Sequence, residues 1–284
     1  ILSGFLFSCV PQQKVSSSKA KLGQVDSQLV AYNNMLKTLD EQRRKKQEGN
    51  EIDDTASVRI QKFIGASQRD IDRLVTQNAI LVGSTVVNKN DWERLRDALT
   101  VSQKSLKNIA DKTAFINDLI NRNTVVKLDQ DVIFDPGQYI VSDQMAGKIG
   151  NFFEPAAREI DLFIKKYPDF PLSLVITAKG YADGTSIVAG SKLYNELKER
   201  LKLSDATPDN KELNKELSRA RAEEVIKLFK KYTDGRSTDG SNIRNILYLY
   251  EGKGEVYPNP RVGDYQQNDP RRRIVLLFWS VFPE

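Results

Sequence analysis

The chain has 284 residues, enough for about two domains of roughly 100–200 residues each. Its 43 basic and 38 acidic residues give a formal net charge of +5 that is spread along the sequence, which indicates a solvated surface and no nucleic-acid partner. Histidine is absent and only one cysteine is present, so the composition excludes imidazole catalysis, histidine-ligated metals, internal disulfides and cysteine metal clusters, and it favours a non-catalytic protein without a cofactor.

The first nine residues form an apolar run that ends at Cys9 and is far shorter than the roughly 20 residues needed to span a bilayer. Leu6 and Ser8 stand at fitting positions of a bacterial lipobox, so residues 1–9 resemble the end of a signal peptide with a lipidation site at Cys9. Acyl chains at Cys9 would attach the protein to a membrane. The alternative is an ordinary apolar N-terminus with an incidental thiol. Residues 10–18, with three successive serines, are predicted to be a polar tether without structure of its own.

Residues 19–123 are predicted to be helical, because apolar residues recur at alternating spacings of three and four, the period of a coiled coil. Breaks are expected at Gly49-Asn50 and around residues 83–90, and Asp91 is expected to begin the third helix.

Each of the three predicted helices carries one such stripe, which must be buried against another helix. The polar residues within the stripes would cost stability while limiting the register of packing. The helices could form an antiparallel bundle within one chain or pair with other chains, so a self-contained bundle and an arm for protein partners or self-association both remain open. The stripes are Leu22, Val25, Leu29, Tyr32, Leu36 and Leu39; Ile60, Ile64, Ser67, Ile71, Leu74, Asn78 and Leu81; and Trp92, Leu95, Leu99, Ser102, Leu106, Ile109, Thr113, Ile116 and Ile120.

Strands and helices alternate in residues 124–284, after a domain boundary predicted at Asn121–Thr124. The pattern predicts an α+β fold, a two-layer βαβαββ sandwich with the helices on one face and a final hairpin at the sheet edge. The expected elements are strand 125–134, turn 135–137, a helix from Ser142 to Phe153, a second helix opened by Pro155, strand 172–179, a helix within 188–203, a helix over 207–232 with Thr207 as its N-cap, and strands 246–250 and 272–281.

Two of these elements each supply a charged residue. Asp183 follows the strand at 172–179, and Arg221 lies on the helix at 207–232, on about the same face as Asn214. A carboxylate can bind an ammonium and a guanidinium can bind a carboxylate, so the pair could hold an amino-acid zwitterion. The alternative is that Asp183 and Arg221 form a salt bridge or are solvated separately.

The segments that carry these charges resemble the signature of the OmpA-like (OmpA/Pal/MotB) peptidoglycan-binding domain, in which Gly-aromatic-small-Asp follows a strand and Asn-x-x-Leu-Ser-x-x-Arg-Ala lies on a helix. The matching segments are Gly180-Tyr181-Ala182-Asp183 and Asn214 to Ala222. Flanking pieces from Asp131 to Phe134, from Gly252 to Pro258 and from Asn268 to Ile274 also match, so the resemblance covers about residues 124–284.

The resemblance implies that Asp183 and Arg221 hold the ammonium and the carboxylate of the diaminopimelate in the peptidoglycan stem peptide, with Asn214 beside them and Arg273 near the ligand. The sequence departs from the family in one respect. Gly184–Leu213 places 30 residues where the family usually has a handful, and this insertion could shade the site or add a surface for a partner.

The sequence therefore predicts a non-catalytic lipoprotein that anchors the envelope to peptidoglycan, at the periplasmic face of the outer membrane of a Gram-negative-type bacterium. The alternative is a cell-wall-anchoring subunit of an envelope-spanning machine, such as a motor, stator or secretion apparatus, that docks its partners through residues 19–123.

Overall fold

The computed structural model describes residues 11–86, 88–122, 124–168, 170–202, 207–234 and 243–283. Cys9, the predicted lipidation site, lies outside the described residues. Within these ranges, none of the helices combines the length and the apolar character needed to cross a bilayer.

The chain folds into two compact units. The helical unit comprises the residues up to Arg44 together with Val58–Asn121. The C-terminal unit comprises Lys45–Ser57 together with the residues from Arg122 onward. Sequence reasoning placed residues 45–57 with the helices, whereas the structure packs them with the sheet of the C-terminal unit.

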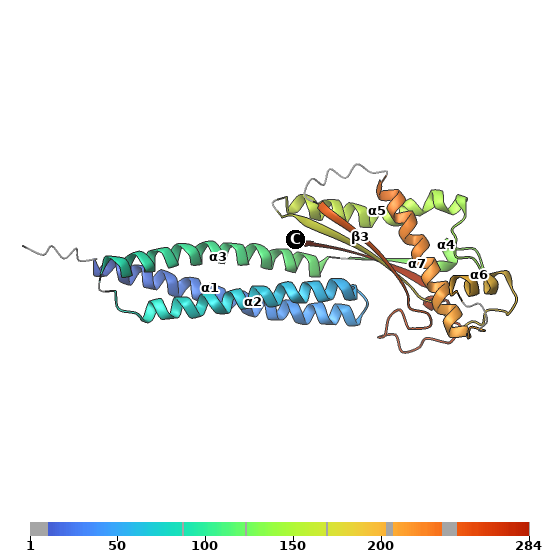
Figure 1. The fold of residues 1–284 in the computed structure, drawn as a ribbon, viewed down its shortest axis with the longest axis horizontal. Coiled ribbons are helices and arrows are strands. Elements are labelled where there is room, and N and C mark those ends of the chain that lie inside the picture. The colour runs from blue at the N-terminus through green and yellow to red at the C-terminus, as the bar shows by residue number, and fades with distance from the viewer. Residues whose placement is uncertain are drawn as a thin grey trace, which may run out of the picture. The chain divides into compact units, whose positions relative to one another are not determined.

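The helical unit is built from three long helices, which Figure 1 shows side by side. The first two are antiparallel, because Asp26 of the first bonds to Asn78 of the second, whereas Asn33 bonds to Asp72. The predicted stripes are buried or half-buried throughout, so they close against one another within a single chain. The helices are α1 (Gln12–Glu48), α2 (Asp54–Gly83) and α3 (Lys89–Asn121).

The predicted tether over residues 10–18 is wrong, since α1 begins at Gln12. Val15 stands seven residues before Leu22 and extends the apolar stripe of α1 by one heptad. It is buried in a cluster with Leu22 and Leu95, which offsets the weak helix propensity of the neighbouring serines. The third helix also begins before the predicted Asp91.

The C-terminal unit contains a four-stranded mixed sheet in the order β1-β4-β2-β3. Strand β4 is antiparallel to both of its neighbours, whereas β2 and β3 are parallel. Two long helices, α5 and α7, contact each other and the sheet, and the strands and helices follow the predicted βαβαββ order. The elements are β1 (Val125–Asp129), α4 (Gln130–Ile133), α5 (Asp143–Lys166), β2 (Leu172–Gly180), α6 (Lys192–Arg200), α7 (Asn210–Asp234), β3 (Ile243–Gly252), a 3₁₀ turn (Pro270–Arg272) and β4 (Ile274–Pro283).

The predicted hairpin at the sheet edge is wrong. Strand β4 lies between β1 and β2, and the edge next to β2 is formed by β3. The sequence of β4 explains its place, because Val275–Phe282 is almost continuously apolar and every residue in it is buried. A strand covered on both faces needs such a run, whereas an edge hairpin usually alternates.

Several predicted boundaries move for local reasons. The first strand ends at Asp129, whose carboxylate accepts a bond from the Asp131 amide and caps α4. The two helices expected around Pro155 are one helix, α5, with the proline inside it. Asn151, whose carbonyl loses its helical donor to Pro155, is exposed, so water can replace that bond.

The helix with the signature begins at Asn210, three residues after the predicted N-cap. Asp209 caps it instead, because its carboxylate accepts from the Glu212 amide at 2.8 Å while the Glu212 carboxylate accepts from the Asp209 amide at 3.0 Å. This reciprocal pair is a capping box. The last strand likewise starts at Ile274, after the 3₁₀ turn, and not at Arg272.

Close packing of α7 on the sheet fixes the position of the signature. A Cβ atom on Gly180 would lie 1.9 Å from the Ser218 carbonyl oxygen, and one on Gly252 would lie 2.3 Å from the Lys215 carbonyl oxygen. Only glycine allows the helix backbone to approach the ends of β2 and β3 this closely. Asn214 to Ala222 is thereby held beside the loop that carries Asp183.

The segment Lys45–Ser57 is attached to the sheet by a buried cluster of charges. Lys179 Nζ lies 3.0 Å from Asp53 and 2.6 Å from Asp54, and the side chains of Lys179 and Asp53 are 2% and 3% exposed. Asn50 adds a bond to the Pro258 carbonyl oxygen. Neighbouring strand residues point to opposite faces, and Gly180 faces α7, so Lys179 and this segment lie on the other face of the sheet.

Candidate functional site

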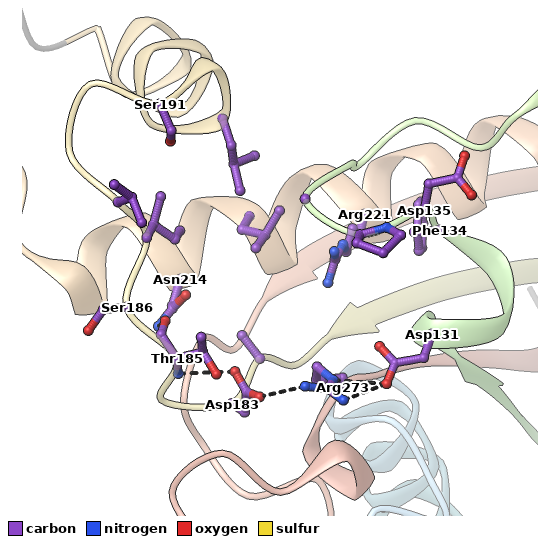
Figure 2. A pocket seen from close by; sticks show the side chains of 17 residues that line it. Asp131, Phe134, Asp135, Asp183, Thr185, Ser186, Ser191, Asn214, Arg221 and Arg273 are labelled. Carbon is purple, nitrogen blue, oxygen red and sulfur yellow. Dashed lines mark hydrogen bonds and ion pairs between the residues drawn. The ribbon is translucent and has the colours of Figure 1, made fainter.

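The four predicted site residues line a single cavity of about 650 Å³ in the C-terminal unit (Figure 2). Asp183 comes from the loop after β2, Asn214 and Arg221 from α7, and Arg273 from the residue before β4. The structure therefore brings together residues that lie up to 90 positions apart in the sequence.

Asp183 is 5% exposed, and other groups hold both of its carboxylate oxygens. Oδ1 accepts from the Thr185 amide at 3.1 Å, and Oδ2 accepts from Arg273 Nη1 at 3.0 Å. A carboxylate oxygen has two acceptor sites, so each oxygen can still accept from an ammonium in the cavity. Asp183 therefore remains suited to a cationic ligand group.

Arg221 is 8% exposed, and its bonded partners are neutral. Its Nε donates to the Gln138 carbonyl oxygen at 3.0 Å, its Nη1 donates to Gln130 Oε1, and its guanidinium lies over the Phe134 ring at 5.2 Å. Burial lowers the pKa of Arg221 to about 10, a shift that Asp131 opposes. With that pKa the guanidinium stays cationic at neutral pH, and a bound carboxylate would relieve the cost of burying it.

The predicted alternative of a salt bridge between Asp183 and Arg221 is not found among the described residues. Asp183 pairs with Arg273 instead, and Arg221 bonds to Gln138 and Gln130. Asp183 and Arg221 thus line the same cavity without bonding to each other (Figure 2).

Arg273 bridges two carboxylates. Its Nε and Nη2 donate to Asp131 Oδ2 at 3.0 and 2.6 Å, while Nη1 donates to Asp183. Burial lowers the pKa of Arg273, but the bonds and charges of Asp131 and Asp183 outweigh it and hold the pKa above its ordinary value. Arg273 therefore acts in this structure as a clamp on Asp183.

Sequence reasoning missed Gln130 and Asp131 as members of the site. Gln130 is 1% exposed and donates to the carbonyl oxygens of Tyr181 and Ile274, which turns its own oxygen toward Arg221. The prediction of a long strand over 125–134 hid both residues. The sequence Asp129-Gln130-Asp131, an N-cap followed by an acidic first turn, was the available signal.

Asn214 holds the loop that follows Asp183. Its Nδ2 donates to the Thr185 carbonyl oxygen at 3.2 Å and to Glu255 Oε1 at 2.9 Å. The structure therefore places Asn214 in the cavity wall, as expected, but commits its amide donors to protein partners.

Ser218 has a structural position. It is fully buried, and its Oγ accepts a bond from the Gly254 amide at 2.9 Å, which fixes the loop after β3 against α7. Of the signature residues on α7, Asn214, Leu217 and Arg221 line the cavity.

The insertion supplies one wall of the cavity. Its first part is fixed to α7, since the Ile187 amide donates to Asn210 Oδ1 at 2.9 Å. Helix α6 is fixed to α7 by Arg200, which pairs with Glu216 at 2.9 Å and Glu223 at 2.7 Å. The lining residues from the insertion are Thr185, Ser186, Ile187, Val188, Ser191 and Leu193.

Among the described residues no group of three or more histidine, cysteine, aspartate or glutamate side chains is arranged to hold a metal ion. Two acidic residues of the cavity, Asp131 and Asp183, are paired with Arg273, which favours binding of a charged organic group there.

Comparisons with known proteins give little similarity. No family model matches the chain, and no curated protein matches it. The chain is similar to the crystal structure of the periplasmic domain of Helicobacter pylori MotB (residues 78–256), with a TM-score of 0.29 and 18% identity over 55% of this chain and 74% of that chain. A shorter form of the same domain (residues 97–256) gives a TM-score of 0.26 and 17% identity, over 55% and 78% of the two chains.

Proposed function

We propose that the C-terminal unit binds an amino-acid zwitterion, and that this zwitterion belongs to the diaminopimelate of the peptidoglycan stem peptide. The observation that carries the proposal is that Asp183 and Arg221 line one cavity while each is held by separate partners. The ammonium of the ligand would bind Asp183, and its carboxylate would bind the guanidinium of Arg221. The signature segments, which resemble those of OmpA-like domains, supply the choice of peptidoglycan.

The energetic argument rests on Arg221. A buried cation with neutral bonded partners is costly, and a carboxylate that enters the cavity replaces lost solvation with a charge-assisted, two-point bond. We also propose that this site is non-catalytic, because Arg273 holds the carboxylates of Asp131 and Asp183 in ion pairs, which suits them to binding more than to proton transfer. Single contacts would be weak, but many copies facing a polymer would gain from multivalency.

On this proposal the protein anchors the envelope to the cell wall. Lipid at Cys9 would attach the chain to the outer membrane at its periplasmic face, and the helical unit would lie in the chain between the lipid and the wall-binding unit. Mass spectrometry of the native protein tests the lipid directly. An unmodified Cys9, or a mature chain that retains the residues before it, would contradict membrane attachment by this route.

Sedimentation with purified sacculi tests the binding site. The full chain should be retained, and Arg221→Met or Asp183→Asn should lower retention at least tenfold, since loss of a charged bond to a ligand costs about 2–5 kcal/mol. Arg219→Met is the matched control, because Arg219 lies on the same helix, is 46% exposed in its side chain and pairs with Glu216. Equal retention of all four proteins would overturn the site.

The second candidate is a cell-wall-anchoring subunit of an envelope-spanning machine. The observation that favours it is the surface of the helical unit. The apolar stripes are buried within the chain, but other apolar residues of α1, such as Val30 and Met35, are 48% and 41% exposed and could contact a partner protein. Photo-crosslinking from Met35 in the native bacterium separates the two candidates. A discrete heterologous adduct, absent when the probe stands at Asn34, supports the machine subunit, and an unchanged monomer supports the simple anchor.

A further inference from the structure

Apolar side chains line the cavity beside the charged ones. They include Ile187, Val188 and Leu193 of the insertion and Leu217 of α7, and Ile187 and Leu193 pack against a cluster that includes Leu217. Figure 2 shows Ser191 and Ser186, which also come from the insertion, away from Asp131 and Arg273. We call the wall formed by Ile187, Val188, Leu193 and Leu217 the apolar end, and the wall formed by Asp131, Asp183, Arg221 and Arg273 the charged end.

The apolar end is a fixed surface. Ile187 and Leu193 are half-buried and pack against the cluster of Leu197, Leu213 and Leu217. Asn210 holds the backbone of Ile187, and Arg200 holds α6 on α7. Contacts within the chain therefore hold this wall in place, which lowers the entropic cost of binding.

Val188 is the exception to this burial, because it lines the cavity and is 73% exposed. An apolar side chain on a fixed wall gains free energy when a ligand removes it from water. A cavity of about 650 Å³ lies in the range of roughly 300–1,000 Å³ that holds whole small molecules, and the zwitterionic head of an amino acid fills only part of it.

We propose that the insertion Gly184–Leu213 makes the site selective for zwitterions that carry an unbranched aliphatic chain, and that this chain lies along Ile187, Val188 and Leu193. The inference rests on the proposed function and adds a specificity element to it. The charged end sets which head group binds, and the apolar end sets how long its chain is.

The ligand class follows from the order of the two ends. On this proposal, an α-amino acid whose head lies at Asp183 and Arg221 extends its side chain toward the insertion. Several methylene groups can then lie on the apolar wall before the chain reaches solvent, where a polar or peptide-linked far end would be tolerated. With a short or charged side chain, Ile187, Val188 and Leu193 would stay in contact with water, and no free energy would be gained from burying them.

A homologous series of free amino acids tests the proposal with the full-length chain. Glycine, alanine, norvaline and norleucine compete for retention on sacculi, and the concentration for half displacement should fall two- to fourfold with each added methylene, given about 0.8 kcal/mol per buried methylene. A flat series, with the wild type still retained on sacculi, overturns this inference and leaves the proposed function standing.

Variants locate the effect. Val188→Ser should lower the gain per methylene to less than twofold without changing displacement by glycine. Because the Val188 side chain is exposed, the substitution should leave the fold intact. Val256→Ser is the matched control, because Val256 is 58% exposed in the same unit and does not line the cavity. An unchanged series in Val188→Ser overturns the inference. Failure of sacculi to retain any form, including the wild type, overturns both proposals together.

Discussion

The two units bury polar side chains in different ways. In the helical unit, Ser102 Oγ donates to Asn78 Oδ1 at 2.9 Å, and Asn78 Nδ2 donates to Asp26 Oδ1 at 2.6 Å. These polar groups satisfy one another across three helices. In the C-terminal unit, Arg221 is equally removed from water but bonds to neutral oxygens and faces a cavity.

This difference distinguishes buried polar groups that stabilise the fold from a buried charge that is suited to bind a ligand. Both arrangements cost desolvation free energy, but only the cluster around Asn78 recovers it inside the chain. A buried charge whose bonded partners do not match it marks a place where a ligand completes the structure. Lys179 is the third case, a buried charge that is matched by Asp53 and Asp54 within its own unit.

The largest expected effect is the loss of that matched charge. Lys179→Met leaves Asp53 buried without its cation, so the free energy of unfolding of the C-terminal unit should fall by about 3–5 kcal/mol. Denaturation followed by the fluorescence of buried Trp279, in a Trp92→Phe background, measures it. Lys253→Met is the control, because the pair of Lys253 with Glu251 is more exposed and should be worth less than about 1 kcal/mol. Equal losses for the two variants would refute the contrast.

Disruption of the hydrogen-bonded cluster of Asp26, Asn78 and Ser102 in the helical unit should lower the free energy of unfolding by a smaller amount. Asn78→Ala leaves Ser102 and Asp26 without their bonds, and we expect about 1–3 kcal/mol of destabilisation. Hydrogen exchange of amides in α2 and α3 reports the loss in this unit alone. Adding Ser102→Ala should cost less than it does in the wild type, because the two groups share one network. Strict additivity would show that the bonds act independently.

Substitution of Arg221 should affect binding to sacculi more than it affects stability. Arg221→Met removes a buried charge, but it also leaves the buried side-chain oxygen of Gln130 without its donor. Stability should therefore fall by about 1–3 kcal/mol, less than for Lys179→Met, while retention on sacculi is lost. Gln138 is an exposed residue, so water can replace the bond to its carbonyl oxygen. Denaturation and sedimentation on the same preparation check both halves. A loss of 3 kcal/mol or more, on the order expected for a matched buried pair, would make Arg221 a structural residue.

The smallest effects are opposite pH dependences of the two units. Burial raises the pKa of Asp26 above 3.8, only partly opposed by its bond to Asn78, so the native helical unit holds its proton more tightly and loses stability as pH rises from 3.8 through the folded pKa. Burial would also raise the pKa of Asp54, but the bonds to Lys179 and Gln47 outweigh it and lower the pKa below 3.8. The C-terminal unit therefore loses stability as pH falls below 3.8.

Amide hydrogen exchange, measured at pH values around 3.8, reports how the stability of each unit changes with pH. Asp26→Asn should flatten the pH dependence of the helical unit and Asp54→Asn that of the C-terminal unit, each leaving the other unchanged. Slopes of the same sign in both units would contradict the assignment.

Local sequence patterns predicted most of the structure of the helical unit. The three- and four-residue spacing predicted the buried stripes and their breaks, because helix packing repeats with the period of the helix. The start of α1 was missed only because the serines before Lys19 suggested a tether, although Val15 continues the stripe.

The C-terminal unit shows what a local pattern leaves out. Alternation placed β2 correctly and the signature placed Asp183 and Arg221, but Lys179 stood on the supposedly polar side of the strand. Its partner Asp54 lies 125 positions away, so nothing near Lys179 indicates burial. The central place of β4 likewise depends on long-range pairing, for which its continuous apolar run was the only sign.

The attachment of Lys45–Ser57 to the sheet gives the molecule a defined path for mechanical load. Tension applied to the chain before α1 would reach the C-terminal unit through α1 and the ion pairs of Lys179 with Asp53 and Asp54, before it could stretch α2 or α3. The hairpin of α2 and α3 thus forms a closed loop outside the loaded path, and a protein shortened to begin at Arg122 would lose the very contacts that carry the force.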